Sequence, residues 1–194
     1  AVGQSSKKPK TDEILAAALR LYRERGFHGV GLDEVGEVAG MSGAAIYHHF
    51  NSKADLLVDA YDQVGGRIAV GVDDAVAMAD SAVDALARLA HAYAATSLNS
   101  VDLIVVTARE FDALPASERP RLARRRRFVR DTWVRVLRQV RTDVSDSEAT
   151  LLVRGTFALI ERYVRLVPAA RADVDELVAL SLAWLLPSHQ VMND

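Results

Sequence analysis

Residues 42–53 hold the side chains whose types and spacing point most directly to a ligand. Two hydrogen-bonding rings, Tyr47 and His48, follow the small side chains of residues 42–45, and Lys53 comes five residues later. A helix with a small-residue face can lie deep in a DNA major groove, where Tyr and His reach phosphates or base edges. Lys53 adds a cation beside the expected start of another helix, where backbone N–H groups also attract anions. The pattern favours contact with DNA, while aromatic packing inside a helical domain is the alternative for the rings.

A second concentration of charge lies at residues 119–141, which hold ten arginines and a single acid, Asp131. The apolar residues between them, such as Val129 and Trp133, keep helical spacing, so one interpretation is the solvated outer face of an amphipathic helix. The other interpretation is that some of these arginines bind a phosphate or carboxylate, which suits the rigid guanidinium fork. The residues concerned are Arg121, Arg124, Arg125 and Arg127.

Composition and missing motifs narrow the function classes. The 194 residues are 50% apolar and 26% charged with a net charge of −2, as in an ordinary water-soluble protein, and there is no cysteine for a disulfide or a thiolate. Neither a phosphate-binding Gly-rich loop nor a His-Glu-x-x-His motif occurs. We therefore expect no catalytic residue, no metal ligand and no cofactor. Since no apolar run is long enough for a membrane span, we expect a cytoplasmic protein without a membrane partner.

Glycine and proline punctuation divides the chain into helical pieces, and no alternating pattern indicates a sheet. The sequence thus predicts an all-α fold with a helix-turn-helix near the N-terminus and a larger C-terminal helical domain. The expected helices cover residues 11–25, 32–39, 43–50, 52–68, 73–79, 82–97, 100–112, 117–141, 146–167 and 173–186.

The two short helices at residues 32–39 and 43–50 are joined by a tight turn. Gly36 and Gly40 leave room for a close crossing. The residues that we expect to face inward are Leu32, Val35, Ala39, Met41, Ile46 and Phe50. We predict a flexible tail at residues 1–8, a helix-turn-helix domain at 9–55, an effector-binding and dimerisation domain at 56–187 and a second tail at 188–194.

Three stretches carry a resemblance to a known family. They are Arg25-Gly-Phe27, the run from Leu32 to Ser42, and Ile46-Tyr-His-His-Phe-Asn-Ser-Lys53-Ala-Asp-Leu56. In type and spacing they resemble the N-terminal pattern of the TetR family of bacterial transcriptional regulators, over about residues 11–60. The resemblance implies a homodimer that binds double-stranded operator DNA. The expected DNA-binding residues are Ser42, Gly43, Ala44, Ala45, Tyr47, His48 and Lys53.

The last two expected helices are apolar on nearly every side, and a monomer surface rarely leaves so much apolar area exposed. We expect them to pair with their copies in a homodimer, which would place two recognition helices in successive major grooves of a near-palindromic site. A small lipophilic effector, of the fatty-acyl or acyl-CoA type, is expected to release the DNA. The expected effector-binding residues are Leu89, Tyr93, Leu103, Val106, Arg109, Phe111, Arg124, Phe128, Trp133 and Phe157.

The sequence therefore predicts a ligand-responsive transcriptional repressor. Two other classes remain open: a small all-α enzyme, and a helical interaction module without DNA binding. Turnover by an acid/base pair would favour the enzyme. A steep salt dependence of duplex DNA binding by the purified dimer would exclude the interaction module.

Overall fold

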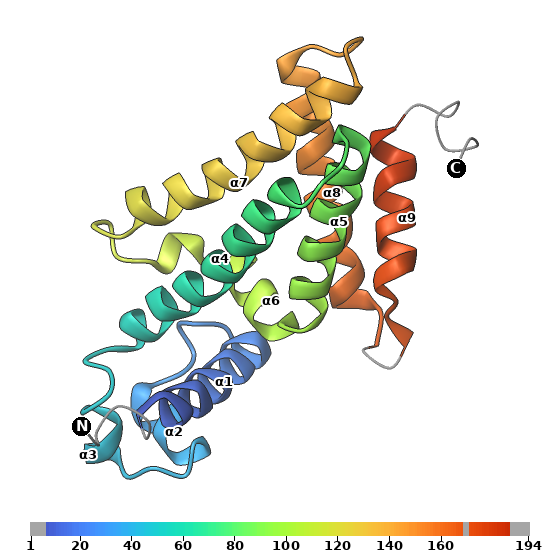
Figure 1. Ribbon diagram of the computed structural model, residues 1–194. Coiled ribbons are helices and arrows are strands. Elements are labelled where there is room, and N and C mark those ends of the chain that lie inside the picture. The colour runs from blue at the N-terminus through green and yellow to red at the C-terminus, as the bar shows by residue number, and fades with distance from the viewer. Residues whose placement is uncertain (1–6, 169–170, 187–194) are drawn as a thin grey trace, which may run out of the picture. The chain divides into compact units, whose positions relative to one another are not determined.

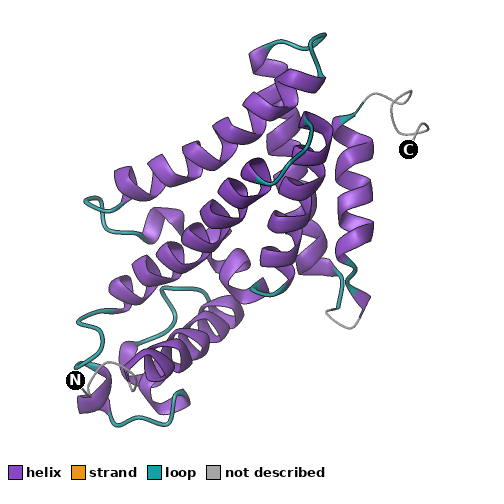
Figure 2. Ribbon diagram, in the orientation of Figure 1, coloured by secondary structure: helices purple, strands orange, loops and turns teal. Residues whose placement is uncertain are grey.

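The computed structural model describes residues 7–168 and 171–186, and within these ranges the chain forms helices joined by loops, with no strand (Figure 2). The all-α prediction is confirmed. In chain order the elements are α1 (Lys7–Arg25), α2 (Leu32–Val38), α3 (Gly43–Ile46), α4 (Lys53–Ala77), α5 (Ala82–Leu98), α6 (Val101–Arg109), the 3-10 turn η1 (Phe111–Ala113), α7 (Arg119–Val140), α8 (Asp146–Leu166) and α9 (Val174–Leu185).

The chain divides into two compact units. The first joins the N-terminal part of the chain, up to residue 63, with residues 102–120. Within it Arg23 of α1 forms an ion pair with Asp102 of α6, with 2.6 Å between Nη1 and Oδ1. The Tyr61 hydroxyl of α4 donates to the Thr107 carbonyl, and the Tyr61 ring packs edge-on against Phe111, 5.8 Å away. These contacts attach α6 and η1 to the same unit as the predicted helix-turn-helix.

The second unit joins residues 64–101 with the chain from residue 121 onward. Helix α9 packs on α5 and α8, and the three run side by side in Figure 1. Helix α8 begins with a capping box, in which the Ser145 side chain accepts from the Glu148 N–H and the Glu148 carboxylate accepts from the Ser145 N–H. Helix α9 has a side-chain N-cap: the Asp173 carboxylate accepts from the Asp175 N–H at 2.8 Å.

Helix α4 corrects the sequence-based boundaries. We expected a break between residues 68 and 73, yet α4 runs unbroken through Gly71 to Ala77. A Cβ added at Gly71 would lie 3.1 Å from the Cβ of Ala92 on α5, and one at Gly65 would lie 2.9 Å from Cδ of Arg125 on α7. These glycines therefore allow neighbouring helices to pack closely. From sequence alone a glycine with this role cannot be told from one that ends a helix.

The glycines of α4 provide a matched pair for a stability test. Gly66 has open space where its Cβ would be, whereas Gly71 faces Ala92. We expect Gly66→Ala to raise the free energy of unfolding by about 0.5–1 kcal/mol through helix propensity. Gly71→Ala should give no such increase in the free energy of unfolding, because the added methyl group would crowd Ala92. Urea unfolding of both variants checks this, and equal stabilisation would contradict the close approach of α4 and α5.

The predicted tail at residues 188–194 lies outside the described residues, as do residues 1–6 of the tail predicted at 1–8. Residues 7 and 8 belong to α1. Over the described ranges no single helix is both long and apolar enough to cross a membrane, and α5 and α6 meet that test only together, as a pair bent at the break between them.

Candidate DNA-binding surface and buried aromatic cluster

The structure contains the tight turn and the close helix crossing that Gly40 and Gly36 predict. Gly40, in the turn after α2, has a φ of +67°, a conformation that other residues rarely adopt. At Gly36 an added Cβ would lie 3.4 Å from the side chain of Ile46, so α2 and α3 cross closely. Most of the residues expected inside are buried, namely Leu32, Val35, Ile46 and Phe50, while Ala39 and Met41 are half-buried.

Helix α3 ends at Ile46, earlier than the predicted end at residue 50, and the outer side of α3 and of the turn after it faces solvent. Tyr47 is 49% exposed, and Ala44 and His48 are also exposed. Ser42 is exposed too, and its Oγ caps α3 by accepting from the Ala45 N–H at 3.3 Å. Ala45 and His49 are half-buried, and Gly43 is the first residue of α3. The two rings are therefore accessible from outside the first unit, as contact with a groove requires.

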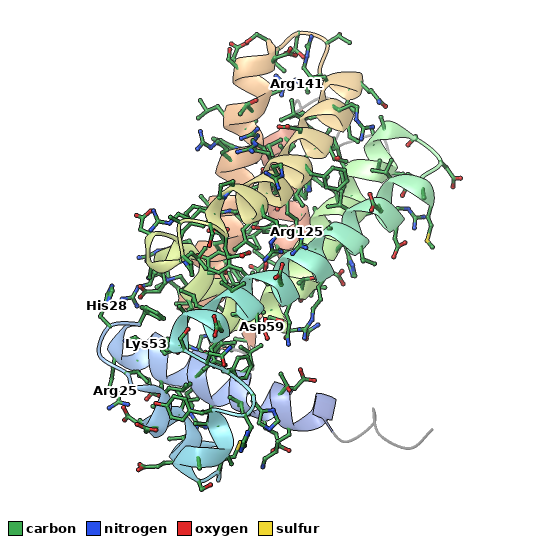
Figure 3. All side chains as sticks on the ribbon, turned by 90° about the vertical axis from the view of Figure 1, so that its left-hand side faces the viewer. Arg25, His28, Lys53, Asp59, Arg125 and Arg141 are labelled. Carbon is green, nitrogen blue, oxygen red and sulfur yellow. The ribbon has the colours of Figure 1, made fainter. Side chains whose placement is uncertain are left out.

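Lys53 has a different environment from the one that we expected. Its Nζ donates to three backbone carbonyls, those of Phe27 at 3.0 Å, His28 at 3.4 Å and Val30 at 3.1 Å. The ammonium also lies over the Phe27 ring, 4.7 Å from its centroid, and Figure 3 shows Lys53 next to His28. Three bonds use every N–H of the ammonium. Lys53 thus fastens the loop between α1 and α2 to the start of α4.

In the second unit three aromatic side chains from three helices form a cluster, in which Tyr93 and Trp133 are buried and Phe157 is half-buried. Tyr93 of α5 stacks on Phe157 of α8 with ring centroids 4.6 Å apart, and Trp133 of α7 meets Phe157 edge-on at 5.2 Å. Trp133 is completely buried, and Leu89, one turn before Tyr93, is buried too. All four residues were expected in the effector site, and the structure places the three rings in mutual contact.

The cluster has a polar side that the sequence analysis missed. The Tyr93 hydroxyl donates to Oε1 of Glu161 at 3.0 Å. Burial raises the pKa of Glu161, and burial together with the Glu161 carboxylate raises the pKa of Tyr93. Arg126 acts on both groups electrostatically, lowering each pKa. A signal existed, because Glu161 stands four residues after Phe157 and therefore on the same helical face.

Trp133 carries an unusual polar atom. Its Nε1 is buried and has no hydrogen-bond partner among the described residues. Buried donors are normally paired, and an unpaired one costs about 1–3 kcal/mol.

The other six expected effector residues take no part in these ring contacts. Arg124 and Phe128 of α7 are exposed, Phe128 to 46%. Leu103, Val106, Arg109 and Phe111 belong to the first unit, where Leu103 and Val106 are buried and Arg109 is exposed. The ten residues are thus divided between two units. Across the described residues there is also no group of three or more His, Asp or Glu side chains that can hold a metal ion.

Residues 14–60 match the family model described as bacterial regulatory proteins, tetR family. The chain is similar to the HTH-type transcriptional repressor KstR2 of Rhodococcus jostii, with 26% identity over 94% of this chain and 92% of that protein. It is also similar to the fatty acid metabolism regulator protein of Bacillus subtilis, with 24% identity over 54% of each chain. The chain spans less than two thirds of the length of several curated relatives that it matches.

The fold is shared with solved structures. One is AibR, determined in complex with isovaleryl coenzyme A and operator DNA, which aligns with a TM-score of 0.77 and 17% identity over 92% of this chain and 99% of AibR. The similarity extends over both units of the chain, whereas the family model covers only residues 14–60.

Proposed function

We propose that this chain, which belongs to the TetR family of bacterial regulators, is a ligand-responsive transcriptional repressor that binds a near-palindromic operator as a homodimer. The observation that carries the proposal is the helix-turn-helix of α2 and α3, in which Tyr47 and His48 face solvent directly after a short helix with a small-residue surface. Such a helix fits a major groove and brings two hydrogen-bonding rings to its edges.

The proposed DNA-binding surface consists of the exposed side of α3 and the residues next to it. Its members are Ser42, Gly43, Ala44, Ala45, Tyr47 and His48. Phosphate contacts from backbone and hydroxyl groups would set the register, and His48 is available for a base edge.

Helices α8 and α9 present the proposed dimer interface. Leu151 of α8 is 69% exposed, and Leu180 and Trp184 of α9 are 46% and 53% exposed. The exposed side of α8 also carries Arg154 and Arg162, while α9 begins with exposed Asp175 and Glu176. A second copy, related by a two-fold axis, can cover the apolar residues and oppose the arginines to the acids.

The effector is proposed to be a small lipophilic molecule of the fatty-acyl or acyl-CoA type. The aromatic cluster of Tyr93, Trp133 and Phe157 supplies an apolar environment, and exposed arginines of α7 supply cations. Two similar proteins support this class, since one is named a fatty acid metabolism regulator and the other was solved with isovaleryl coenzyme A.

The test of the proposal is capture of genomic DNA fragments by the purified protein, followed by sequencing. We expect recovered fragments to share a near-palindrome with half-site centres about one helical turn, roughly 34–36 Å, apart or a multiple of it. Binding to the recovered site should weaken steeply as salt rises. Fragments without a common sequence, bound no better than random DNA, would contradict a repressor.

Lys53 allows a separate prediction about how the surface is held. Because its ammonium is already bonded to three carbonyls, we expect Lys53→Met to leave the salt dependence of operator binding unchanged. Loss of those charge-assisted bonds should lower stability by about 1–2 kcal/mol and loosen the loop beside α2.

The measurements are thermal unfolding and operator affinity over a salt series. If Lys53 instead contacts a phosphate, the slope of log affinity against log salt falls by about one unit, without the loss of stability.

A further inference from the structure

The indole N–H of Trp133 is the buried polar group that the packing of the second unit does not explain. The side chain is 0% exposed, and Nε1 has no partner among the described residues. A phenylalanine would fill much of the same space without a buried donor. The indole therefore suggests a partner that arrives with a ligand, since a donor shielded from water is satisfied only by a group that enters the cluster.

The neighbours of Trp133 indicate what kind of group that is. The rings of Tyr93 and Phe157 lie 6.2 and 5.2 Å from the indole, so the molecule that carries the acceptor must be mainly apolar. A neutral N–H requires only an acceptor and does not call for a negative charge. A carbonyl oxygen on an aliphatic chain meets both conditions.

Glu161 argues against a free carboxylate in this place. Its Oε1 accepts from the Tyr93 hydroxyl at 3.0 Å, so a second carboxylate beside the cluster would meet a like charge in a buried setting. Several cations of α7 are exposed, including Arg126, which acts electrostatically on both Glu161 and Tyr93. Arg124 and Arg127 of α7 are exposed, where phosphate groups of a larger ligand can reach them without burial.

We propose, on the basis of the acyl effector suggested above, that the Tyr93–Trp133–Phe157 cluster binds a neutral acyl carbonyl, as in a thioester, and disfavours a free fatty acid. Trp133 Nε1 donates to the carbonyl oxygen, the aromatic rings contact the acyl chain, and Glu161 excludes carboxylates. The effector is thus an activated acyl group, such as an acyl-CoA.

Isothermal titration calorimetry of the full chain with three probes tests the proposal. The probes are decanoyl-CoA, the neutral thioester S-decanoyl-N-acetylcysteamine, and decanoate, which share one acyl chain. We expect both thioesters to bind at least about tenfold more tightly than decanoate, a difference of about 1.4 kcal/mol.

Two variants assign the effect to named residues. Trp133→Phe should weaken both thioesters about tenfold and change decanoate binding by less than about twofold, because only the thioester carbonyl uses the N–H. Glu161→Gln keeps an acceptor for Tyr93 and removes the negative charge, so it should tighten decanoate binding with little effect on the neutral thioester. A purely structural Glu161 would not produce that gain.

Tyr163→Phe is the control, since Tyr163 of α8 donates its hydroxyl to Glu176 of α9 and takes no part in the ring contacts of the cluster. It should leave all three affinities unchanged. Decanoate binding as tightly as the thioesters, or thioester binding unaffected in Trp133→Phe, would overturn the carbonyl assignment while leaving the acyl effector class in place. If none of the probes binds, both the assignment and the acyl class fail, while the DNA-binding proposal is unaffected.

Discussion

Replacing Leu180 with glutamate is expected to convert the proposed homodimer into a monomer and to weaken operator binding by at least about a hundredfold. Leu180 is 46% exposed within one protomer, so the fold tolerates the change. In the proposed interface each copy would instead bury an unpaired carboxylate against apolar side chains, which costs several kcal/mol. A monomer also loses the second helix-turn-helix, which the dimer holds at high effective concentration over the other half-site.

Light scattering and operator titration measure the two effects. Val70→Glu is a matched control, because Val70 is also an exposed aliphatic residue, 61% exposed, but lies on α4. It should remain dimeric and bind the operator. Leu185, the neighbour of Trp184, is unsuitable for this test because it is completely buried in the protomer, so a charge there would unfold the chain. A dimer of unchanged stability in Leu180→Glu would move the interface away from α9.

A carboxylate on the outer side of α3 should abolish specific DNA binding. Ala44 is exposed, and the helix cap formed by Ser42 does not involve the Ala44 side chain. The Ala44→Glu variant should therefore fold normally. In the proposed complex the new charge faces the phosphate-lined groove, where repulsion and an unpaired desolvated charge together cost about 3 kcal/mol or more, which is more than a hundredfold in affinity.

Ala116→Glu adds the same charge to an exposed loop outside the helix-turn-helix and serves as the control. Its operator affinity should stay within about threefold of the unmodified protein. Equal losses in the two variants would mean that net charge, and not the position on α3, governs binding. Undiminished affinity in Ala44→Glu would remove α3 from the DNA interface.

The helix-turn-helix could be predicted from sequence because its determinants are local. Gly40 must adopt a positive φ, Gly36 must approach Ile46, and the apolar residues keep helical spacing over fewer than twenty positions. The exposure of Tyr47 and His48 follows from the same spacing, since the inward positions of this segment are taken by Ile46 at the end of α3 and by Phe50 after it.

The features that sequence did not reveal depend on distant partners. In the sequence Gly71 looks like a residue that ends a helix, whereas in the structure it allows close packing against Ala92. Lys53 was expected to face a phosphate, but its ammonium is bonded to the carbonyls of a loop more than twenty residues earlier. Glu161 joins the aromatic cluster only because α5 brings Tyr93 within hydrogen-bond distance. In each case tertiary contact, which has no periodic signal, decides the role.

The two tryptophans of the chain differ sharply in environment: Trp133 is fully buried in the aromatic cluster, whereas Trp184 is half exposed, with its ring over Gly155 of α8. The protein therefore contains two intrinsic fluorophores that report separate events. In a Trp133→Phe background, dilution should shift Trp184 emission to longer wavelength as the subunits part and water reaches the ring. In a Trp184→Phe background, the emission should stay constant on dilution and change only when a ligand reaches the indole of Trp133.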